Sequence, residues 1–369
     1  MDFPLSTNNR GVIMNIAAVI MCSFALLGAL DRIFGNKFGL GAAFERGFEM
    51  LGTLALSMLG MIIISPFLAD LMNPLLQSLP DFIDPSIITS SIFANDMGGA
   101  PLTVEVARDA EIGLFNALIT GAMMGCTVSF TIPYALSAVK KERQKDVLLG
   151  LLCGIVTIPV GCLAGGMAYG ISLTKLIINL LPLLLFSAII ALGLIFVPNL
   201  CVKIFTGIGY LIKALITVGL AVGIVHLLTG YTPIENITPL MEAGEIVINA
   251  AVVMSGAFPL LHIISKLLSK PLKRLSEAKH IPPTSIMGIL SSLATSATTF
   301  CDIKNMDSKG AIINSAFAVS GAFLLTDHLA FTLSFEESYL PAVLIGKAIA
   351  ALFAVGVAFL LTNRKKNEA

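Results

Sequence analysis

Long apolar runs constrain this chain more than any other feature of its sequence. A helix needs about 20 predominantly apolar residues to cross a bilayer. Because lipid offers backbone N–H and C=O groups no partners, such runs fold as helices that satisfy their own hydrogen bonds. We therefore predict an all-α polytopic membrane protein with about nine full spans: Gly11–Ile33, Arg46–Met72, Glu111–Val139, Val147–Ile171, Leu173–Val197, Phe205–Leu228, Gly244–Leu268, Lys309–Leu333 and Ser338–Thr362.

The composition supports this class and excludes others. Only 12% of the 369 residues are charged, against roughly 25% in soluble domains. Lys+Arg and Asp+Glu both number 23, so the basic excess typical of a nucleic-acid partner is missing. The 6 cysteines are scattered without a Cys-x-x-Cys pair, so we expect neither a disulfide framework nor a metal site.

Two polar stretches interrupt this apolar sequence. Ser90–Pro101 contains an Asn-Asp pair, two adjacent glycines and a proline, and Ser291–Phe300 is rich in serine and threonine. Glycine and proline both interrupt helices. Non-helical backbone at membrane depth occurs only where it is buried in protein or lines a water-filled cavity. Two broken helices in corresponding positions of two halves indicate the binding site of a transporter.

The basic residues predict the orientation. Lys140–Lys145, Lys266–Lys279 and Arg364–Lys366 are basic clusters, and such clusters mark cytoplasmic loops. The nine spans agree with all three clusters only if both interrupted stretches return to the side from which they came. We therefore expect Asp81–Ala107 to re-enter from outside and Pro283–Cys301 from the cytoplasm, giving about eleven hydrophobic segments.

The two halves of the chain align at a spacing of 200 residues, obtained as 321 − 121. Corresponding spans run in opposite directions, which is typical of an inverted-repeat transporter. We predict a first repeat at 1–172, a connecting helix at 173–199 and a second repeat with a short cytoplasmic tail at 200–369. The alternative is a helical bundle whose repeat is accidental. The matching pairs are Glu45/Glu245, Ser65/Ser265, Ala94/Ala294 and Gly121/Gly321.

Asp96 is the strongest candidate for substrate binding. A carboxylate at mid-bilayer costs about 2.5–3.5 kcal/mol, so it needs a partner. A small ammonium substrate or a proton would supply one, although Asp96 could instead brace the helix break. The other candidates offer short polar groups or open backbone. Gly98 and Gly99 supply open backbone at the first break, and we expect Asn116 and Asn314 to line the cavity from opposing spans. The remaining candidates are each equally suited to capping a half-helix: Asn95, Thr295, Ser296, Thr298 and Thr299.

Asp327 and His328 form a candidate proton relay at the predicted outer end of their span, because a neighbouring carboxylate can tune histidine for proton transfer. An ordinary solvated span end is the alternative. Lys213 lies inside a span and is expected to extend its ammonium group to the cytoplasmic interface.

No catalytic, phosphate-binding or metal-ligand motif occurs. We expect no enzyme, cofactor or metal, and the sequence leaves a coupling ion, H⁺ or Na⁺, undetermined.

Several stretches resemble the EutH ethanolamine permease family of bacterial ethanolamine-utilisation systems. The most specific is Gly154–Gly166, and the resemblance runs nearly end to end. In one departure, Ala294–Phe300 carries serine and threonine where the family often has an Asn-Asn-Ile-Pro type sequence. The remaining matching stretches are Asp96–Gly99, Met306–Gly310, Ile313–Ser320, Asp327–Leu329, Phe44–Phe48 and Ala29–Ile33.

The resemblance implies a multi-pass permease of the bacterial cytoplasmic (inner) membrane that imports ethanolamine. Ethanolamine is a small amino alcohol, mostly cationic at neutral pH, and Asp96 would receive its ammonium group. The altered second break favours, as an alternative, a carrier of the same fold for another amine, an amino acid or a nucleoside. A membrane sensor without transport is a further alternative. The expected partners are the substrate and the lipid bilayer, with no nucleic acid; a homo-oligomer is left open.

Overall fold

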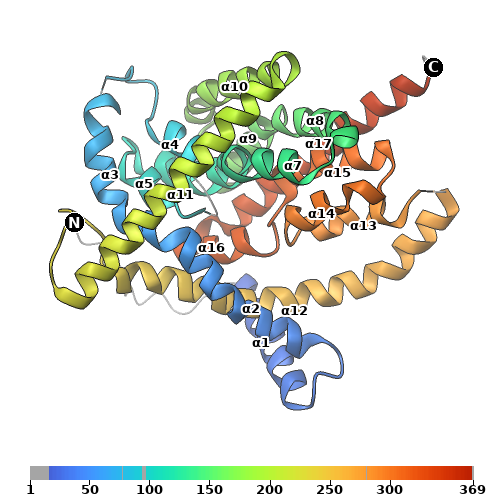
Figure 1. Ribbon diagram of the computed structural model, residues 1–369, viewed down its shortest axis with the longest axis horizontal. Coiled ribbons are helices and arrows are strands. Elements are labelled where there is room, and N and C mark those ends of the chain that lie inside the picture. The colour runs from blue at the N-terminus through green and yellow to red at the C-terminus, as the bar shows by residue number, and fades with distance from the viewer. Residues whose placement is uncertain (1–15, 77, 94–96, 280, 368–369) are drawn as a thin grey trace.

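Every regular element of the protein is a helix in residues 16–76, 78–93, 97–279 and 281–367, which the computed structural model describes (Figure 1). Within these ranges, 8 helices are long and apolar enough to cross a membrane. The predicted class, an all-α polytopic membrane protein, is confirmed; the predicted number of nine spans is not. The eight are Ile16–Ile33, Leu40–Leu76, Ala110–Ala138, Lys141–Tyr169, Leu173–Phe196, Pro198–Thr229, Leu240–Ala278 and Glu337–Asn363.

Some long helices are composed of several segments. The turns η1, η3 and η4 are π-helical, and η5 and η6 are 3₁₀-helical. The elements in chain order are α1 (Ile16–Ile33), α2 (Leu40–Leu54), η1 (Ala55–Leu59), α3 (Gly60–Leu76), α4 (Ser86–Phe93), α5 (Ala100–Glu105), α6 (Ala110–Phe115), η3 (Asn116–Gly125), η4 (Thr127–Thr131), α7 (Ile132–Ala138), α8 (Lys141–Ile155), α9 (Ile158–Tyr169), α10 (Leu173–Phe196), α11 (Pro198–Thr229), α12 (Leu240–Lys279), α13 (Pro283–Ser292), α14 (Ser296–Asp302), η5 (Ile303–Asn305), α15 (Ser308–Gly321), α16 (Asp327–Phe335), η6 (Glu337–Tyr339) and α17 (Leu340–Asn367).

Both interrupted stretches are re-entrant hairpins. In the first hairpin (residues 84–109, with α4 and α5), the backbone N–H groups of Arg108 and Asp109 each donate to the Asp84 carboxylate at 3.0 Å. In the second hairpin (residues 283–305, with α13 and α14), Thr284 Oγ1 donates to the carbonyl of Asn305 at 2.7 Å. The two ends of each segment therefore lie side by side, which confirms that each returns to the end of the bundle it left. Figure 1 shows the two hairpins on opposite sides of the molecule.

The span predicted at Lys309–Leu333 is wrong, because the structure divides it into α15 and α16. Residues 322–326 between them are not helical, and Phe323 has a φ of 60°. The N–H of Phe323 donates to the carbonyl of Ser292, and that of Leu325 to Leu293, both at 3.1 Å. Hydrogen bonds to the second hairpin thus replace those of a continuous helix.

Two hydrogen bonds mark the two ends of the helix bundle. At one end, Arg143 from the basic loop Lys140–Lys145 donates to the carbonyl of Met306 at 2.7 Å, beside the base of the second hairpin. At the other end, Asn236, in the loop before α12, donates to the Asp70 carboxylate of helix α3 at 2.6 Å. The basic cluster Lys140–Lys145 therefore lies at the same end of the bundle as the base of the second hairpin.

An antiparallel helix pair connects these two ends. The N–H of Thr238 donates to the carbonyl of Ile63 at 2.9 Å, and His262 contacts the carbonyl of Phe38 at 3.2 Å. Residue numbers rise along one helix as they fall along the other. We call the continuous helix α2–η1–α3 together with α12 the frame pair. The first hairpin lies near one end of this pair and the second hairpin near the other (Figure 1).

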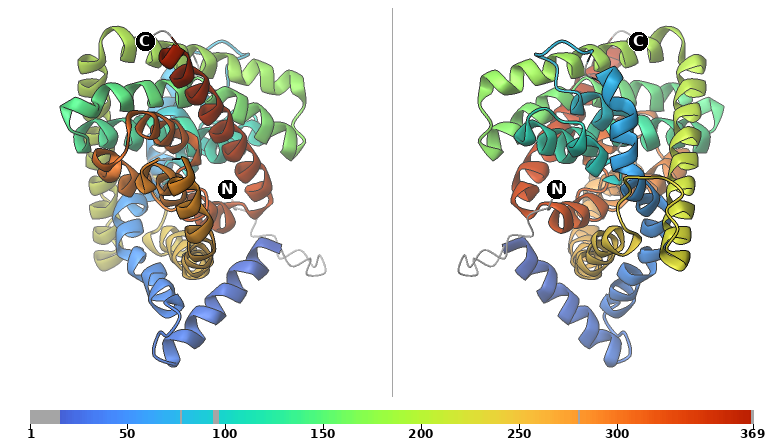
Figure 2. Two further views of the ribbon diagram at one scale, coloured as in Figure 1. Left: turned by 90° about the vertical axis from the view of Figure 1, so that its right-hand side faces the viewer. Right: turned by 90° about the vertical axis from the view of Figure 1, so that its left-hand side faces the viewer.

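Helix α1 packs on α12 and α2, and it projects with the start of α2 as a V from the rest of the molecule (Figure 2). The turn between the two helices is held by the Asp31 carboxylate, which accepts the N–H groups of Leu40 and Gly41 at 2.8 and 3.0 Å. Large apolar side chains such as Leu26 and Leu30 are exposed on α1. Lipid is the medium that suits this face.

Helices α3 and α11 touch through glycine. A Cβ atom added to Gly219 of α11 would collide with the carbonyl group of Gly60. A Cβ atom added to Gly60 of α3 would likewise collide with the carbonyl group of Ile216. Because these are backbone atoms, they cannot rotate away. Gly207, on the same helix α11, has open space where its Cβ would be.

We predict that Gly219→Ala lowers the free energy of unfolding by roughly 1–3 kcal/mol, the usual range for overpacking. Gly207→Ala is the matched control and leaves stability unchanged or slightly raised, since alanine favours helix over glycine. The measurement is the apparent melting temperature of both variants in detergent, read by size-exclusion chromatography. Equal melting temperatures would contradict the close approach of α3 and α11.

Candidate functional site

The first helix break lies against the frame pair. Asn95 and Asp96 fall outside the residues that the structure describes, so the break is characterised by the residues that follow them. Met97 is fully buried and has a φ of 67°, an uncommon conformation for a residue other than glycine. A Cβ atom at Gly98 would lie 3.0 Å from the Cα of Met58, in the π-helical turn η1. Gly99 is buried, and its carbonyl accepts the hydroxyl of Thr103 at 3.0 Å.

The second helix break is paired with the break between α15 and α16. Besides the two backbone hydrogen bonds described above, Thr326 Oγ1 donates to the carbonyl of Ala294 at 2.7 Å. Consecutive carbonyls freed at residues 292–294 therefore all find partners in residues 322–326. We call residues 292–294 and residues 322–326 the paired breaks. The sequence predicted the break at 292–294 but not the break at 322–326.

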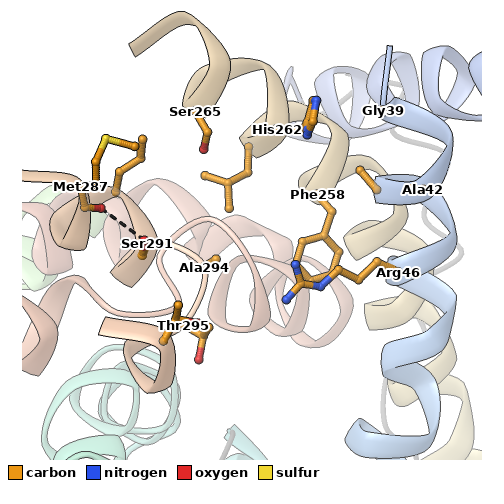
Figure 3. Close-up of a pocket in the computed structure, with 14 residues that line it drawn as sticks. Gly39, Ala42, Arg46, Phe258, His262, Ser265, Met287, Ser291, Ala294 and Thr295 are labelled. Carbon is orange, nitrogen blue, oxygen red and sulfur yellow. Dashed lines mark hydrogen bonds between the residues drawn. The ribbon is translucent and has the colours of Figure 1, made fainter. Parts of the chain in front are cut away.

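A cavity of about 620 Å³ opens beside the second break (Figure 3). Among the predicted site residues, Thr295 and Thr298 line it. In Figure 3, Arg46 from α2 extends beside Phe258 of α12, with its Cζ 4.9 Å from the ring centroid. We call this the hydroxyl-lined cavity; its lining is Gly39, Ala42, Ala43, Arg46, Phe258, Leu261, His262, Ser265, Met287, Leu290, Ser291, Ala294, Thr295 and Thr298.

The other hydroxyl groups of α14 point away from this cavity's lining. Thr299 is buried; its Oγ1 donates to the carbonyl of Gly288 at 3.0 Å and lies 2.8 Å from Ser292 Oγ. Thr299 thereby ties the two half-helices of the second hairpin together. Ser296 is also fully buried, and its Oγ has no hydrogen-bond partner within the described part of the chain. Such an orphan hydroxyl is an unused donor and acceptor near the break.

Asn116 and Asn314 secure the bases of the two hairpins. Asn116 Nδ2 donates to Ser86 Oγ, at the start of α4, at 2.8 Å. Asn314 Nδ2 donates to the carbonyl of Ser285, near the start of α13, at 2.7 Å. Asn116 also exchanges hydrogen bonds of 3.0 and 2.9 Å with Asn179 of α10. The structure therefore places the two asparagines in separate, fully buried positions outside the lining of the hydroxyl-lined cavity.

Asp327 and His328 begin α16 directly after a break, rather than ending a continuous span. His328 is 1% exposed, so the alternative of a solvated span end does not apply to it. Its ring lies 5.4 Å from that of Phe323 in the paired breaks. Its Nδ1 has no hydrogen-bond partner in the described ranges. The interior position follows from the break that divides the predicted span.

Sequence reasoning missed Lys347, a lysine in the apolar part of α17. It is 1% exposed, and its Nζ donates to the carbonyl of Ala122 in the π-helical segment η3 at 2.9 Å. A lone lysine inside the last apolar run was the available signal, since an intramembrane ionisable residue suggests function. Lys213, the lysine singled out in the sequence, is exposed in the structure.

A second cavity, of about 240 Å³, lies near the other end of the frame pair. Its carboxylates are Glu105 from α5 and Glu242 and Glu245 from α12. None of the three side chains forms an ion pair or hydrogen bond with another described residue. We call it the acidic cavity; it is lined by Ile62, Ser65, Pro66, Pro101, Glu105, Thr238, Glu242, Glu245, Ile246, Asn249, Ser334 and Phe335.

The base of the first hairpin carries a separate charge cluster. Lys175 Nζ lies 2.7 Å from Asp109 Oδ2 and 3.1 Å from Glu111 Oε2. The hydrogen bond from Lys175 holds the pKa of Asp109 below its ordinary value, with backbone N–H groups acting in the same direction. The resulting stabilisation is present above the ordinary pKa and is lost as the pH falls through the lowered one. Because Asp109 is 39% exposed, water screens much of this effect.

Within the described residues, no group of three His, Cys, Asp or Glu side chains is placed to hold a metal ion. The arrangement instead offers polar cavities at two ends of one helix pair, each beside a re-entrant hairpin. Helix breaks and cavities of this kind are features of membrane transporters. The protein is a multi-pass membrane protein of the transporter class.

The chain belongs to the EutH family: residues 13–361 match the family model described as "Ethanolamine utilisation protein, EutH". It is 42% identical to a "Probable ethanolamine permease EutH" of Listeria monocytogenes, over 97% of both chains. It is 37% identical to "Uncharacterized protein YxeR" of Bacillus subtilis over 93% of both chains. It is 34% identical to a "Probable ethanolamine permease EutH" of Salmonella typhimurium, over 95% of this chain and 96% of that one. No solved structure matches the chain significantly.

We predict that Thr326→Val destabilises the paired breaks by up to about 1–3 kcal/mol, because the half-buried carbonyl of Ala294 loses its hydrogen-bond partner. Thr326→Ser keeps the hydroxyl and is the matched control, expected to stay close to wild type. Apparent melting temperatures in detergent compare the three proteins. A valine variant as stable as the serine variant would show that the cross-break hydrogen bond does not stabilise the fold.

Proposed function

We propose that the protein carries ethanolamine across the bacterial cytoplasmic membrane. The observation that carries this proposal is the pair of polar cavities at opposite ends of the frame pair, one of them lined by three carboxylates that have no ion-pair partner among the described residues. Protonated ethanolamine is a small cation with one hydroxyl group. Carboxylates attract the ammonium group, and serine or threonine side chains can hydrogen-bond the hydroxyl. The relatives named probable ethanolamine permeases support this substrate.

The path would run along the frame pair. Ala43 lines the hydroxyl-lined cavity and Ile62 lines the acidic one; their separation of 19 positions along the helix corresponds to roughly 28 Å. Gly98 of the first break lies against Met58 of η1, between these positions. In our proposal Asn95, Asp96, Gly98 and Gly99 receive the ammonium group there.

The hydroxyl end of the substrate would meet the second break. Thr295 and Thr298 already line a cavity, and Ser296 has a buried hydroxyl without a partner in the described ranges. Thr299, Asn116 and Asn314 would then act indirectly, because their hydrogen bonds hold the hairpins in position. Opening one hairpin base while the other stays closed would expose the substrate to one side at a time.

An inverted repeat accounts for this arrangement. Ser65 lines the acidic cavity and Ser265 the hydroxyl-lined cavity, and these residues are 200 apart in the chain. An asparagine also stands at each hairpin base, at a similar spacing of 198 residues, obtained as 314 − 116. We therefore propose repeats at 1–172 and 200–369, joined by a helix at 173–199. Helix α10 is the element that lies in this joining segment.

We assign the hydroxyl-lined cavity to the cytoplasmic side, because the positive-inside rule favours that side for the basic clusters. The acidic cavity then faces outward and would concentrate the cationic substrate at the entrance. Import would begin at the acidic cavity and end at the larger one. The serine- and threonine-rich second break also favours a second candidate substrate, another small hydroxylated amine. Competition by a panel of such amines against labelled ethanolamine separates the two.

We expect Asp96→Asn to abolish uptake of labelled ethanolamine into proteoliposomes, because an amide cannot neutralise the ammonium group in a desolvated site. Asp81→Asn removes a carboxylate from an exposed loop and is the matched control, with unchanged uptake. Both variants must elute from size exclusion like the wild type. Undiminished transport by the asparagine variant at position 96 would remove Asp96 from the mechanism.

Replacing Glu105, Glu242 and Glu245 together by glutamine should raise the KM for ethanolamine and leave the maximal rate unchanged. Exposed charge pairs are worth roughly 0.2–1 kcal/mol each, so three of them correspond to about a tenfold change at low salt. High salt should reduce the difference, because it screens exposed charges. A KM that is insensitive to all three substitutions would show that the acidic cavity does not attract the substrate.

A further inference from the structure

Lys347 is a buried cation that the proposed substrate path does not use. It lies on α17, which packs against α8, α9, α15, α16 and η3. An ammonium group has three N–H donors, and among the described residues Lys347 has a single hydrogen-bond acceptor, the carbonyl of Ala122. None of the ion pairs between described residues includes Lys347. A charge buried in this way is costly unless another group compensates it.

The titratable groups that interact electrostatically with Lys347 come from three of these neighbours. They are Cys162 on α9, Cys126 at the end of η3 and His328 on α16. Helix α16, which carries His328, packs directly on α17. From α8, Cys153 belongs to the same apolar cluster as Ala354 and Ala358, two to three turns further along α17. From α15, Lys309 bonds Asn363, near the far end of α17.

The paired breaks connect this buried group to the substrate path. Ala294 lines the hydroxyl-lined cavity, and its carbonyl accepts a hydrogen bond from Thr326. His328 follows two residues later, and its own N–H donates to the carbonyl of Phe323 at 3.2 Å. A movement of the second break on substrate binding would therefore be transmitted to His328. The free Nδ1 of this histidine can accept or donate a proton.

We propose that Lys347 is a proton-binding site, served by His328, and that the protein exchanges one ethanolammonium ion for one proton. This inference rests on the proposed function, in which Asp96 binds the ammonium group. One carboxylate in a dry interior neutralises one cation. The empty carrier then holds protonated Lys347, and the loaded carrier holds the substrate cation with Lys347 neutral.

The exchange balances charge and atoms. On the side where substrate binds, the N–H proton of Lys347 passes through the His328 imidazole to water, and no bond of ethanolamine changes. On the other side the substrate leaves and a proton from water returns by the same route. Each cycle moves one positive charge in each direction. Uptake should therefore be insensitive to membrane potential and should raise the pH of the receiving compartment.

Proteoliposomes with the purified full chain and a trapped pH dye test this exchange. Mildly acidic buffer keeps ethanolamine protonated, and protein-free liposomes report leakage of the free base. For the wild type we expect exchange of labelled for unlabelled ethanolamine, and alkalinisation of the lumen when ethanolamine is added outside. For Lys347→Gln we expect exchange to persist, alkalinisation to fall to the protein-free level, and uptake to become driven by an inside-negative potential.

Three further variants separate this role from a structural one. Lys347→Arg keeps a permanent charge and should lose exchange while eluting normally from size exclusion. His328→Gln should keep exchange and slow the alkalinisation. Lys309→Gln makes the same charge change outside the site and should match the wild type.

The proposal is overturned if the wild type exchanges ethanolamine without changing the lumen pH, or if Lys347→Gln alkalinises the lumen normally. Loss of exchange in the folded glutamine variant would also overturn it, since Lys347 would then be needed for substrate movement itself. A wild type that does not exchange ethanolamine at all would instead refute the proposed function. The two failures are thus distinguished by the exchange assay.

Discussion

Satisfaction of backbone hydrogen bonds where helices break is the constraint on which this structure depends. A broken helix inside an apolar bundle leaves carbonyl and N–H groups without water, and each unpaired group costs free energy. At the second hairpin this need is met by a second broken helix, since residues 322–326 donate to the carbonyls at residues 292–294. The two breaks stabilise each other, so neither can become a regular helix without leaving the other unsatisfied. That dependence keeps open backbone beside the hydroxyl-lined cavity.

The same constraint explains the role of the polar residues at the hairpin bases. Asp84 accepts the N–H groups of Arg108 and Asp109, and Asn116 and Asn314 each bond the start of a half-helix. These contacts fix where each hairpin starts and let its interior carry irregular backbone. The frame pair between the hairpins then has polar cavities near both ends, with Arg46 and His262 at one and three glutamates at the other.

Much of the fold could be predicted because its signals are local. The lengths of the apolar runs predicted the long helices. The requirement that the basic loops lie on one side of the membrane predicted both hairpins. The break after Gly321 could not be predicted in this way, since the segment is as apolar as a true span and is interrupted only by its partners in the second hairpin. For the candidate site, the sequence identified Thr295 and Thr298 as cavity residues. It misjudged His328 as near an outer end and overlooked Lys347, because burial depends on which helices surround a residue.

By itself, the sequence determined that the chain is a helical membrane protein of the EutH family, with two polar interruptions. The tertiary structure alone decided that two breaks pair with each other, that Asn116 and Asn314 serve hairpin bases, and that Lys347 is enclosed beside His328. The physical reason is the separation along the chain over which each kind of interaction acts. Hydropathy and helix-breaking residues act through neighbours in the chain, whereas hydrogen-bond partners and burial are set by contacts between segments 29 to 225 residues apart.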